Sequence, residues 1–244
     1  MLLDRYREAI DDLFKKVRDT QTQNIIKAGE LVADSVANGG CIFLSSICHH
    51  MEMDSVYRGG GPIFYKHFSY NLTIENDARK RDNSDLGYDT QGAEARYALT
   101  QSNFRPGDVL FLASVSGRTK KVVDLAYEAV KLGIKVVAFT SMEYATQVEP
   151  VHPSGKKLYE IATITIDNCA PAAEAMLDVE GIEAKFGAAS GIASDYIMWS
   201  ITSVAVEKLL EKGITPGILK SANFPGGNDY NKTVIEPNYE KYGW

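Results

Sequence analysis

The stretch Val109-Leu110-Phe111-Leu112-Ala113-Ser114-Val115-Ser116-Gly117-Arg118-Thr119-Lys120-Lys121 passes from a continuous apolar run into small hydroxyl residues and a glycine. The apolar run predicts a buried strand, and the helical spacing of apolar residues over 122–132 predicts a helix after it. The hydroxyls of Ser114, Ser116 and Thr119 then lie in a tight loop that leads into a helix. Backbone N–H groups and the helix dipole favour an anion there, such as a phosphate. The alternative is an ordinary turn in which a serine caps the helix.

Other short apolar runs predict a sheet around this strand. They alternate with helical segments, which is typical of a parallel sheet covered on both faces. We predict strands at 41–44, near 71–74, and at 109–113, 135–140 and 162–167, with helices at 4–37 (in two pieces), 119–132, 155–160 and 190–213. Ligands on such sheets bind beyond the carboxyl ends of the strands. Residues 45–46, 114–119 and 140–141 all follow predicted strands, so one shared site is expected.

The composition restricts the classes of partner and compartment. The 244 residues carry a formal net charge of −6, which attracts neither nucleic acid nor an anionic membrane. No segment has the run of about 18 apolar residues that a membrane span needs. Three cysteines without a Cys-x-x-Cys spacing, and an N-terminus without the apolar core of a signal peptide, favour the cytoplasm. Nucleotide-binding glycine motifs are absent, and no cofactor is expected.

The loop Ser114-Val115-Ser116-Gly117-Arg118-Thr119 resembles the Ser-x-Ser-Gly-x-Thr phosphate loop of SIS (sugar isomerase) domains. The resemblance covers nearly the whole chain and is strongest to single-domain bacterial members that are similar to phosphoheptose isomerase. Its other pieces are 28–40, 49–60, 106–108, 140–141, 152–158, 167–169 and 221–231.

This resemblance implies a fold and an assembly. The fold is a three-layer α/β/α sandwich with a five-stranded parallel sheet, of the doubly wound, flavodoxin-like kind. Residues 1–220 form the SIS domain, including the N-terminal helical region. The assembly is a homodimer or homotetramer with sites between subunits.

The resemblance also implies which residues bind the phosphosugar. They are Ser114, Ser116, Gly117 and Thr119 of the phosphate loop, together with Ser45 and Ser46 after the first strand. The first loop of SIS domains usually reads Gly-x-Gly-x-Ser, whereas this chain has Ser45-Ser46-Ile47-Cys48-His49. The glycines that let a backbone approach a sugar closely are therefore missing.

Aldose–ketose isomerisation requires an acid and a base, because a proton moves between adjacent carbons. His49 and Glu52 are spaced to share one face of a helix, and Asp54 follows them. Glu94 is a further candidate, because it resembles a family glutamate that precedes the 106–108 turn. Alternatively, these carboxylates are ordinary surface residues of a helix.

A metal site is the remaining alternative for the histidines. Cys48, His49 and His50, with His67 and His152 elsewhere, could supply ligands. Adjacent histidines on a helix point in different directions, and no second pair has the spacing of a zinc finger. We therefore expect no metal. The charged segment 75–92 is expected to be a solvated loop or a lid.

Three functions remain open at this stage. The first is a phosphosugar isomerase that uses carboxylate or histidine proton transfer. The second is a non-catalytic protein that binds a phosphosugar for regulation, which the altered first loop favours. The third is a lyase or etherase that acts on an amino-sugar phosphate. In each case the partner is a phosphorylated sugar.

The C-terminal segment 221–244 has little periodicity but carries several large apolar or aromatic residues. Burying them is favourable by about 25 cal/mol per Å² of apolar area, so the segment is expected to pack on something. Asn223, Asn228 and Asn231 offer amides that suit sugar hydroxyls. We predict that this tail closes an intersubunit site of a homo-oligomer. The residues concerned are Phe224, Tyr230, Ile235, Tyr239 and Trp244.

Overall fold

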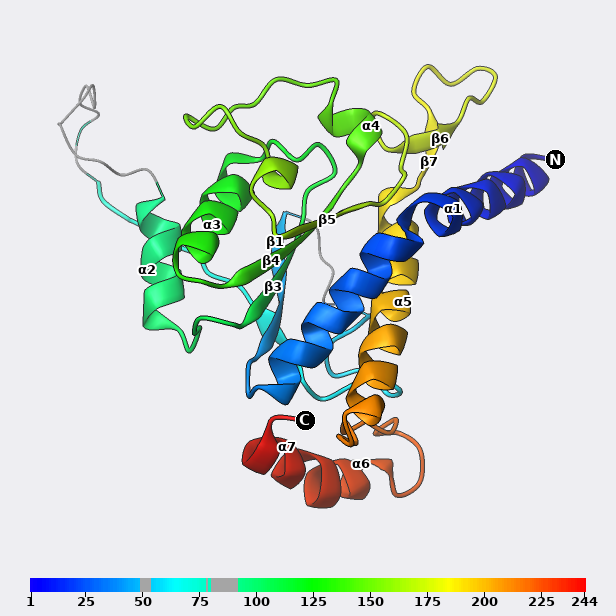
Figure 1. The fold of residues 1–244 in the computed structure, drawn as a ribbon. Coiled ribbons are helices and arrows are strands. Elements are labelled where there is room, and N and C mark those ends of the chain that lie inside the picture. Colours follow the sequence, from blue (N-terminus) through cyan, green and yellow to red (C-terminus); the bar gives the residue numbers. More distant parts are fainter. Residues whose placement is uncertain (49–53, 78, 80–91) are drawn as a thin grey trace.

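The computed structural model describes residues 1–48, 54–77, 79 and 92–244. Five parallel strands form its central sheet in the order β2-β1-β3-β4-β5, with helices on both faces (Figure 1). The predicted three-layer α/β/α sandwich is therefore confirmed. The strands are β1 (Ile42–Cys48), β2 (Tyr65–Phe68), β3 (Val109–Ala113), β4 (Lys135–Thr140) and β5 (Ile164–Asp167).

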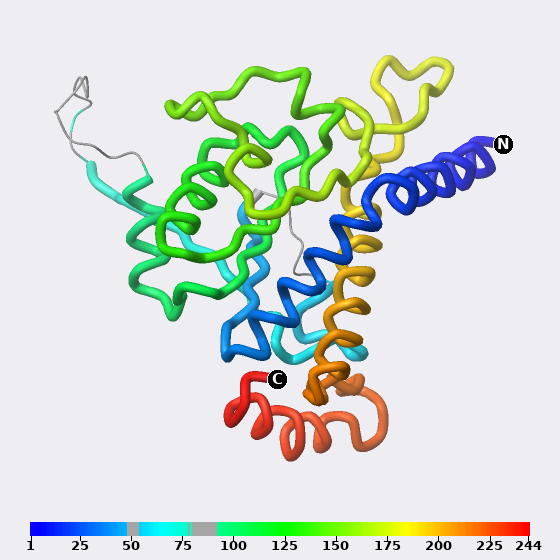
Figure 2. The backbone as a smooth tube through the Cα atoms, viewed as in Figure 1, coloured from blue at the N-terminus to red at the C-terminus, as the bar shows by residue number. Residues whose placement is uncertain are grey.

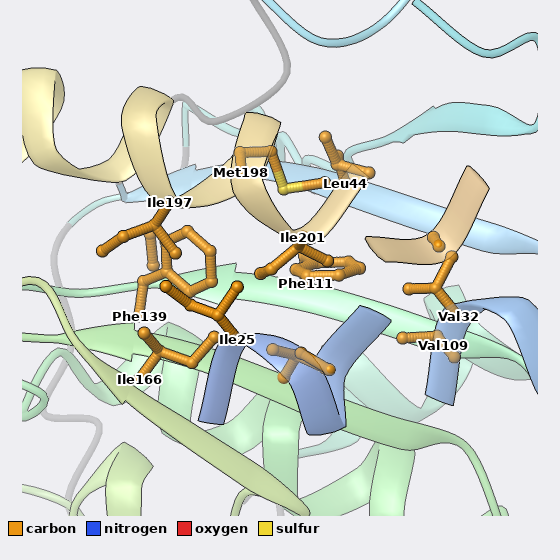
Figure 3. Packing of buried hydrophobic residues seen from close by; sticks show 14 of the residues in the cluster. Ile25, Val32, Leu44, Val109, Phe111, Phe139, Ile166, Ile197, Met198 and Ile201 are labelled. Carbon is orange, nitrogen blue, oxygen red and sulfur yellow. The ribbon is translucent and has the colours of Figure 1, made fainter. Parts of the chain in front are cut away.

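Two long helices, α1 (Leu2–Ala37) and α5 (Ser190–Glu211), cover one face of the sheet. Their apolar residues, among them Ile25 and Ile201, pack against Phe111 and Phe139 of the central strands (Figure 3). The helices approach closely at Gly29, where a Cβ atom would lie 2.5 Å from the Cβ of Val204. A side chain at that position would push the two helices apart.

The prediction that the N-terminal helical region forms two pieces was wrong, because α1 is one helix of 36 residues. The polar stretch 19–23 does not interrupt it. The hydroxyls of Thr20 and Thr22 donate to the carbonyls of Lys16 and Arg18, four residues earlier. Such bonds satisfy the threonine hydroxyls within the helix, so polarity alone does not end it.

The opposite face is covered by α2 (Ala93–Gln101), α3 (Lys120–Lys131) and the 3₁₀ turn η1 (Leu158–Glu160). Helix α2 was not predicted, and the helix expected at 155–160 is only this one turn. The strand expected near 71–74 is also wrong, since the edge strand β2 lies at 65–68. Leu72 and Ile74 have β propensity but are 61% and 75% exposed, whereas Tyr65 and Phe68 are buried.

Beyond β5 the chain adds a two-stranded antiparallel hairpin, β6 (Ala175–Leu177) and β7 (Phe186–Ala188), which was not predicted. The tail, residues 221–244, then forms a helical segment that lies beyond the C-terminal end of α5 (Figure 2). It comprises α6 (Gly227–Tyr230), the π-helical η2 (Asn231–Ile235) and α7 (Glu236–Tyr242).

The tail buries part of its apolar surface on its own chain, although Phe224 is 72% exposed. Ile235 packs with Ile63 and Leu219, and Tyr239 and Trp244 pack against the core of α1 and α5. Its weak periodicity in the sequence reflects a helix that changes from α to π and back. The division into a domain at 1–220 and an oligomer-contacting tail stays a prediction.

Helices α2 and α3 are joined by a buried carboxylate. Glu128 of α3 binds Arg96 of α2 at 2.8 Å and Lys131 at 2.9 Å, and its side chain is only 6% exposed. The hydrogen bond from Arg96, helped by Lys131, lowers the pKa of Glu128. A carboxyl whose pKa is lowered by folding stabilises the protein above its unfolded pKa, and this contribution disappears as the pH falls through the folded pKa.

We therefore expect Glu128→Gln to lower the free energy of unfolding by about 1 kcal/mol at pH 7, a figure reduced because both cations are about half exposed. The difference from wild type should shrink by pH 3, which lies below the ordinary glutamate pKa of about 4.3, and vanish as the pH falls through the lower folded-state pKa of Glu128. Urea unfolding at both pH values measures it. Glu211→Gln, which removes an exposed partner of Lys208, is the control and should show no such pH dependence. If the difference in unfolding free energy between wild type and Glu128→Gln stays constant down to pH 3, the ionised Glu128 carboxylate does not stabilise the fold.

Candidate functional site

The predicted phosphate loop, residues 114–119, lies at the carboxyl end of β3, the middle strand of the sheet. All five residues of β3 are buried. The chain continues from β1 to β2 on one side and reaches β3 on the other, so the strand order reverses between β1 and β3. Open parallel sheets bind their ligands at such a reversal point. The fold thus places the loop where a ligand site is expected.

Main-chain hydrogen bonds fix the shape of the phosphate loop. The N–H of Ser114 donates to Phe139 O at 3.0 Å, and the N–H of Gly117 donates to Ser114 O at 3.0 Å. Gly117 has φ +65°, a left-handed conformation that favours glycine. Its carbonyl accepts from the N–H of Leu158 at 2.8 Å, which ties the loop to η1. The loop is therefore held from β4 and from η1 at once.

The three hydroxyls of the loop differ in exposure. Ser114 is buried and its Oγ lies 3.4 Å from Oγ1 of Thr119, whereas Ser116 is half-buried and Thr119 is exposed. Thr119 stands at the N-cap of α3, a helix of 12 residues. Ser116 and Thr119 therefore offer hydroxyls beside the positive end of a helix dipole, an arrangement that favours an anion.

The neighbouring serines lie inside β1 rather than in a loop after it. We expected the strand to end at Leu44, but it continues to Cys48, which pairs with Ala113 of β3. The pairing shifts register between Leu44 and Cys48, and the N–H of Ile47 donates to Ser45 Oγ at 3.1 Å. Ser45 is fully buried and Ser46 half-buried. The end of β1 thus lies beside the start of the phosphate loop.

The predicted catalytic residues fall in different places. His49 and Glu52 lie outside the described residues, as does most of the helix expected at 49–58. Its described part, 54–58, forms turns. Asp54 binds Arg58 at 3.1 Å and accepts a hydrogen bond from the indole N–H of Trp199 at 3.4 Å.

Asp195 is an acidic residue that our sequence reasoning missed. It lies on α5 one turn before Trp199, and it is near enough to Asp54 for their charges to interact. Burial, together with the negative charge of Asp54, raises the pKa of Asp195. The structure thus brings two carboxylates together from segments that are far apart in the sequence. The signal available in the sequence was an isolated acid in the apolar first half of a helix.

Glu94 lies in the first turn of α2 and accepts from Lys121 Nζ at 3.2 Å. The same ammonium lies 4.5 Å from the ring centroid of Tyr70. Burial, with the charges of Glu94 and Asp124, raises the pKa of Tyr70. Because Lys121 is the second residue of α3, Glu94 is linked to the helix that begins at the phosphate loop.

His152 has a structural connection to the same helix. Its Nε2 lies 2.8 Å from Asp124, which also binds Lys120 at 2.7 Å. The N–H of Ser154 donates to its Nδ1 at 3.1 Å, so Nε2 carries the proton that bonds Asp124. In the described part of the chain, no group of three or more His, Cys, Asp or Glu side chains could hold a metal ion.

The sequence of this chain is similar to those of known proteins that share its fold. Residues 5–141 match the sequence profile of the SIS domain, and the chain belongs to the SIS-domain family. A UPF0309 protein of Streptomyces coelicolor is 32% identical over 97% of this chain and 95% of its own. A UPF0309 protein of Shouchella clausii is 30% identical over 96% and 95%.

A solved structure has a similar fold. The Vibrio vulnificus NanR protein complexed with ManNAc-6P superposes with a TM-score of 0.51 at 15% identity, over 87% of this chain and 67% of that one. The likeness at this identity concerns the fold. None of the helices within the described ranges is long and apolar enough to cross a membrane.

Proposed function

We propose that this protein binds a phosphorylated sugar at the phosphate loop and interconverts its aldose and ketose forms. The observation that carries the proposal is the set of hydroxyls at the start of α3, held by main-chain bonds at the reversal point of the sheet. Ser116 and Thr119 would donate to the phosphate oxygens together with N–H groups of the first turn. Ser46 lies two residues before the end of the neighbouring strand β1, on the side toward which the sugar would extend. The NanR complex, with ManNAc-6P bound to a similar fold, supports this class of ligand.

The isomerase step would use paired acid and base groups. A base removes a proton from the carbon next to the carbonyl, while an acid gives a proton to the carbonyl oxygen, and an enediol forms. The base then returns its proton to the neighbouring carbon, and the other group takes back a hydroxyl proton. Asp54 and Asp195 suit these roles, since the raised pKa of Asp195 keeps it protonated to a higher pH than an ordinary aspartate. Glu94, His49 and Glu52 are the further candidates.

Two alternative functions would use the same phosphate-binding loop. A non-catalytic binding or regulatory protein would need the loop but no acid–base pair, and a lyase or etherase on an amino-sugar phosphate would use a carboxylate to remove the proton. We further propose a homodimer or homotetramer, and sedimentation of the full chain tests that assembly.

The variant Ser116→Ala tests whether residues 114–119 bind the phosphate. Hydrogen bonds to charged groups contribute about 1–3 kcal/mol, so the affinity for a phosphosugar is expected to fall about 5- to 150-fold. Isothermal titration with N-acetylmannosamine 6-phosphate, glucose 6-phosphate and fructose 6-phosphate measures it. Ser102→Ala, at the C-cap of α2, is the matched control. Equal affinity in wild type and Ser116→Ala would refute phosphate binding by this loop.

Deuterium exchange separates the three functions. In D₂O an isomerase introduces deuterium at the carbon that receives the proton from the base. A lyase that removes its proton reversibly introduces deuterium at the carbon that loses the proton, and a non-catalytic binder introduces none. Release of a second product then marks the lyase or etherase. Asp195→Asn should abolish the exchange and retain binding, because an amide can hydrogen-bond but cannot transfer the proton. Exchange at the wild-type rate in Asp195→Asn would remove Asp195 from the mechanism.

A further inference from the structure

A cavity of about 440 Å³ lies between the tail and the edge of the sheet. Its lining combines Tyr57, Lys66 of β2 and Tyr239 of α7 with Asn228 and Glu240 of the tail. Lys66 pairs with Phe43 in the first half of β1, whereas the phosphate loop follows the carboxyl end of β3. The cavity is therefore separate from the phosphate loop. Its volume falls in the range that small-molecule sites occupy.

Main-chain bonds give this cavity a fixed shape. The N–H of Gly60 donates to Leu219 O at 2.7 Å, and the N–H of Leu219 donates to Gly61 O at 2.9 Å. The amide of Asn231 bonds both the N–H and the carbonyl of Lys220, at 2.9 and 2.8 Å. Asn231 is thus occupied in holding the wall, while Asn228 lines the cavity. A preformed wall reduces the ordering cost of binding.

Two aromatic rings flank a single ammonium in the cavity. Lys66 Nζ lies 3.8 Å from the ring centroid of Tyr239 and 5.3 Å from that of Tyr57. Tyr57 is 69% exposed, yet its backbone is held at φ +54°, a conformation that is costly for a tyrosine. Strained backbone conformations of this kind concentrate at active sites and ligand-binding segments.

The side chains that line the cavity carry two positive and two negative charges. Lys66 and Lys220 face Glu236 and Glu240, which lie one turn apart on α7. Burial lowers the pKa of Lys66, and Glu240 opposes that shift. A ligand with a net charge would gain attraction from one pair and repulsion from the other. The carboxylates, the ammonium groups and the amide of Asn228 can instead accept from and donate to hydroxyl groups.

We propose that this cavity is a second ligand site, separate from the phosphate loop, for an uncharged polyhydroxylated molecule such as a sugar or polyol. The exposed ring of Tyr57 takes the apolar C–H surface of the ligand, while Tyr239 holds the Lys66 ammonium in place. Asn228, Glu240 and Lys220 bind its hydroxyls. The balanced lining explains why this site suits an uncharged molecule, whereas the helix N-terminus at the phosphate loop suits an anion.

The test titrates the full-length protein with glucose, mannose and sorbitol as uncharged probes, followed by saturation-transfer NMR. At least one probe is expected to bind saturably, and Tyr57→Ala is expected to weaken that binding at least tenfold. Tyr57→Phe should retain it, because the ring remains. Tyr97→Ala, which removes an equally exposed tyrosine on α2, is the control and should bind as wild type does.

Variants of the phosphate loop distinguish this proposal from the proposed function. Binding of the uncharged probe should survive Ser116→Ala, and phosphosugar binding should survive Tyr57→Ala. No saturable binding of any of the three probes, equal affinity in wild type and Tyr57→Ala, or loss of the signal in Ser116→Ala would each overturn the second site. None of these outcomes would affect the evaluation of the phosphate loop, which rests on its own titration.

Discussion

Gly117→Ala is expected to reduce phosphosugar affinity about 100-fold. Gly117 has φ +65°, and a Cβ atom there would lie 3.2 Å from Oγ1 of Thr140. Thr140 cannot easily move, because it is fully buried and its hydroxyl donates to Val115 O at 3.0 Å. The loop must shift instead, and the hydroxyls of Ser116 and Thr119 then lose their positions together. Two hydrogen bonds to a charged group correspond to about 3 kcal/mol or more.

Gly155→Ala is the matched control for this variant. Gly155 has φ +69°, but a Cβ atom there meets nothing within 4 Å. Both variants should therefore lose about 1–2 kcal/mol of stability from the left-handed conformation, and only Gly117→Ala should lose affinity. Titration calorimetry and urea unfolding of the two proteins give the comparison. If both variants bind a phosphosugar equally well, the loop geometry does not control binding.

Gly227→Ala is expected to lower the free energy of unfolding by about 2–4 kcal/mol. A Cβ atom at this position would lie 2.0 Å from the carbonyl oxygen of Ser221. Backbone cannot yield as a side chain can, so the turn at 221–226 must change shape and displace the helical part of the tail that follows it. Ile235, which is 5% exposed and packs with Ile63 and Leu219, would lose its contacts. Loss of one such buried side chain costs about this much.

Urea unfolding and limited proteolysis measure the effect of Gly227→Ala. Proteolysis should release the tail in this variant before the rest of the chain is cut. Gly191→Ala is the control, since its Cβ meets nothing within 4 Å and alanine favours the helix α5 in which it lies. A Gly227→Ala protein as stable as Gly191→Ala would mean that the tail is not held as described. Sedimentation of both proteins also tests whether a correctly placed tail is needed for a homo-oligomer.

The central part of the fold was predictable from local patterns. The run Val109–Ala113 is fully buried in the middle of the sheet, and a strand buried on both faces must be apolar throughout. The helix after it was predictable because its apolar residues recur at helical spacing, and the small residues between them indicated a tight loop. The edge strand was misplaced, since Leu72 and Ile74 have the side chains of a strand without its burial.

The sequence by itself determined four of the five strands of the sheet, the helices α3 and α5 and the family, because each depends on residues that are close together in the chain. Only the tertiary structure decided which side chains from distant segments meet. It brought Asp195 of α5 to Asp54, and it folded the tail against β2 to form the cavity beside Lys66 and Tyr57. Contacts of this kind depend on the packing of α1 and α5 and on the path of the tail, and no local spacing encodes them.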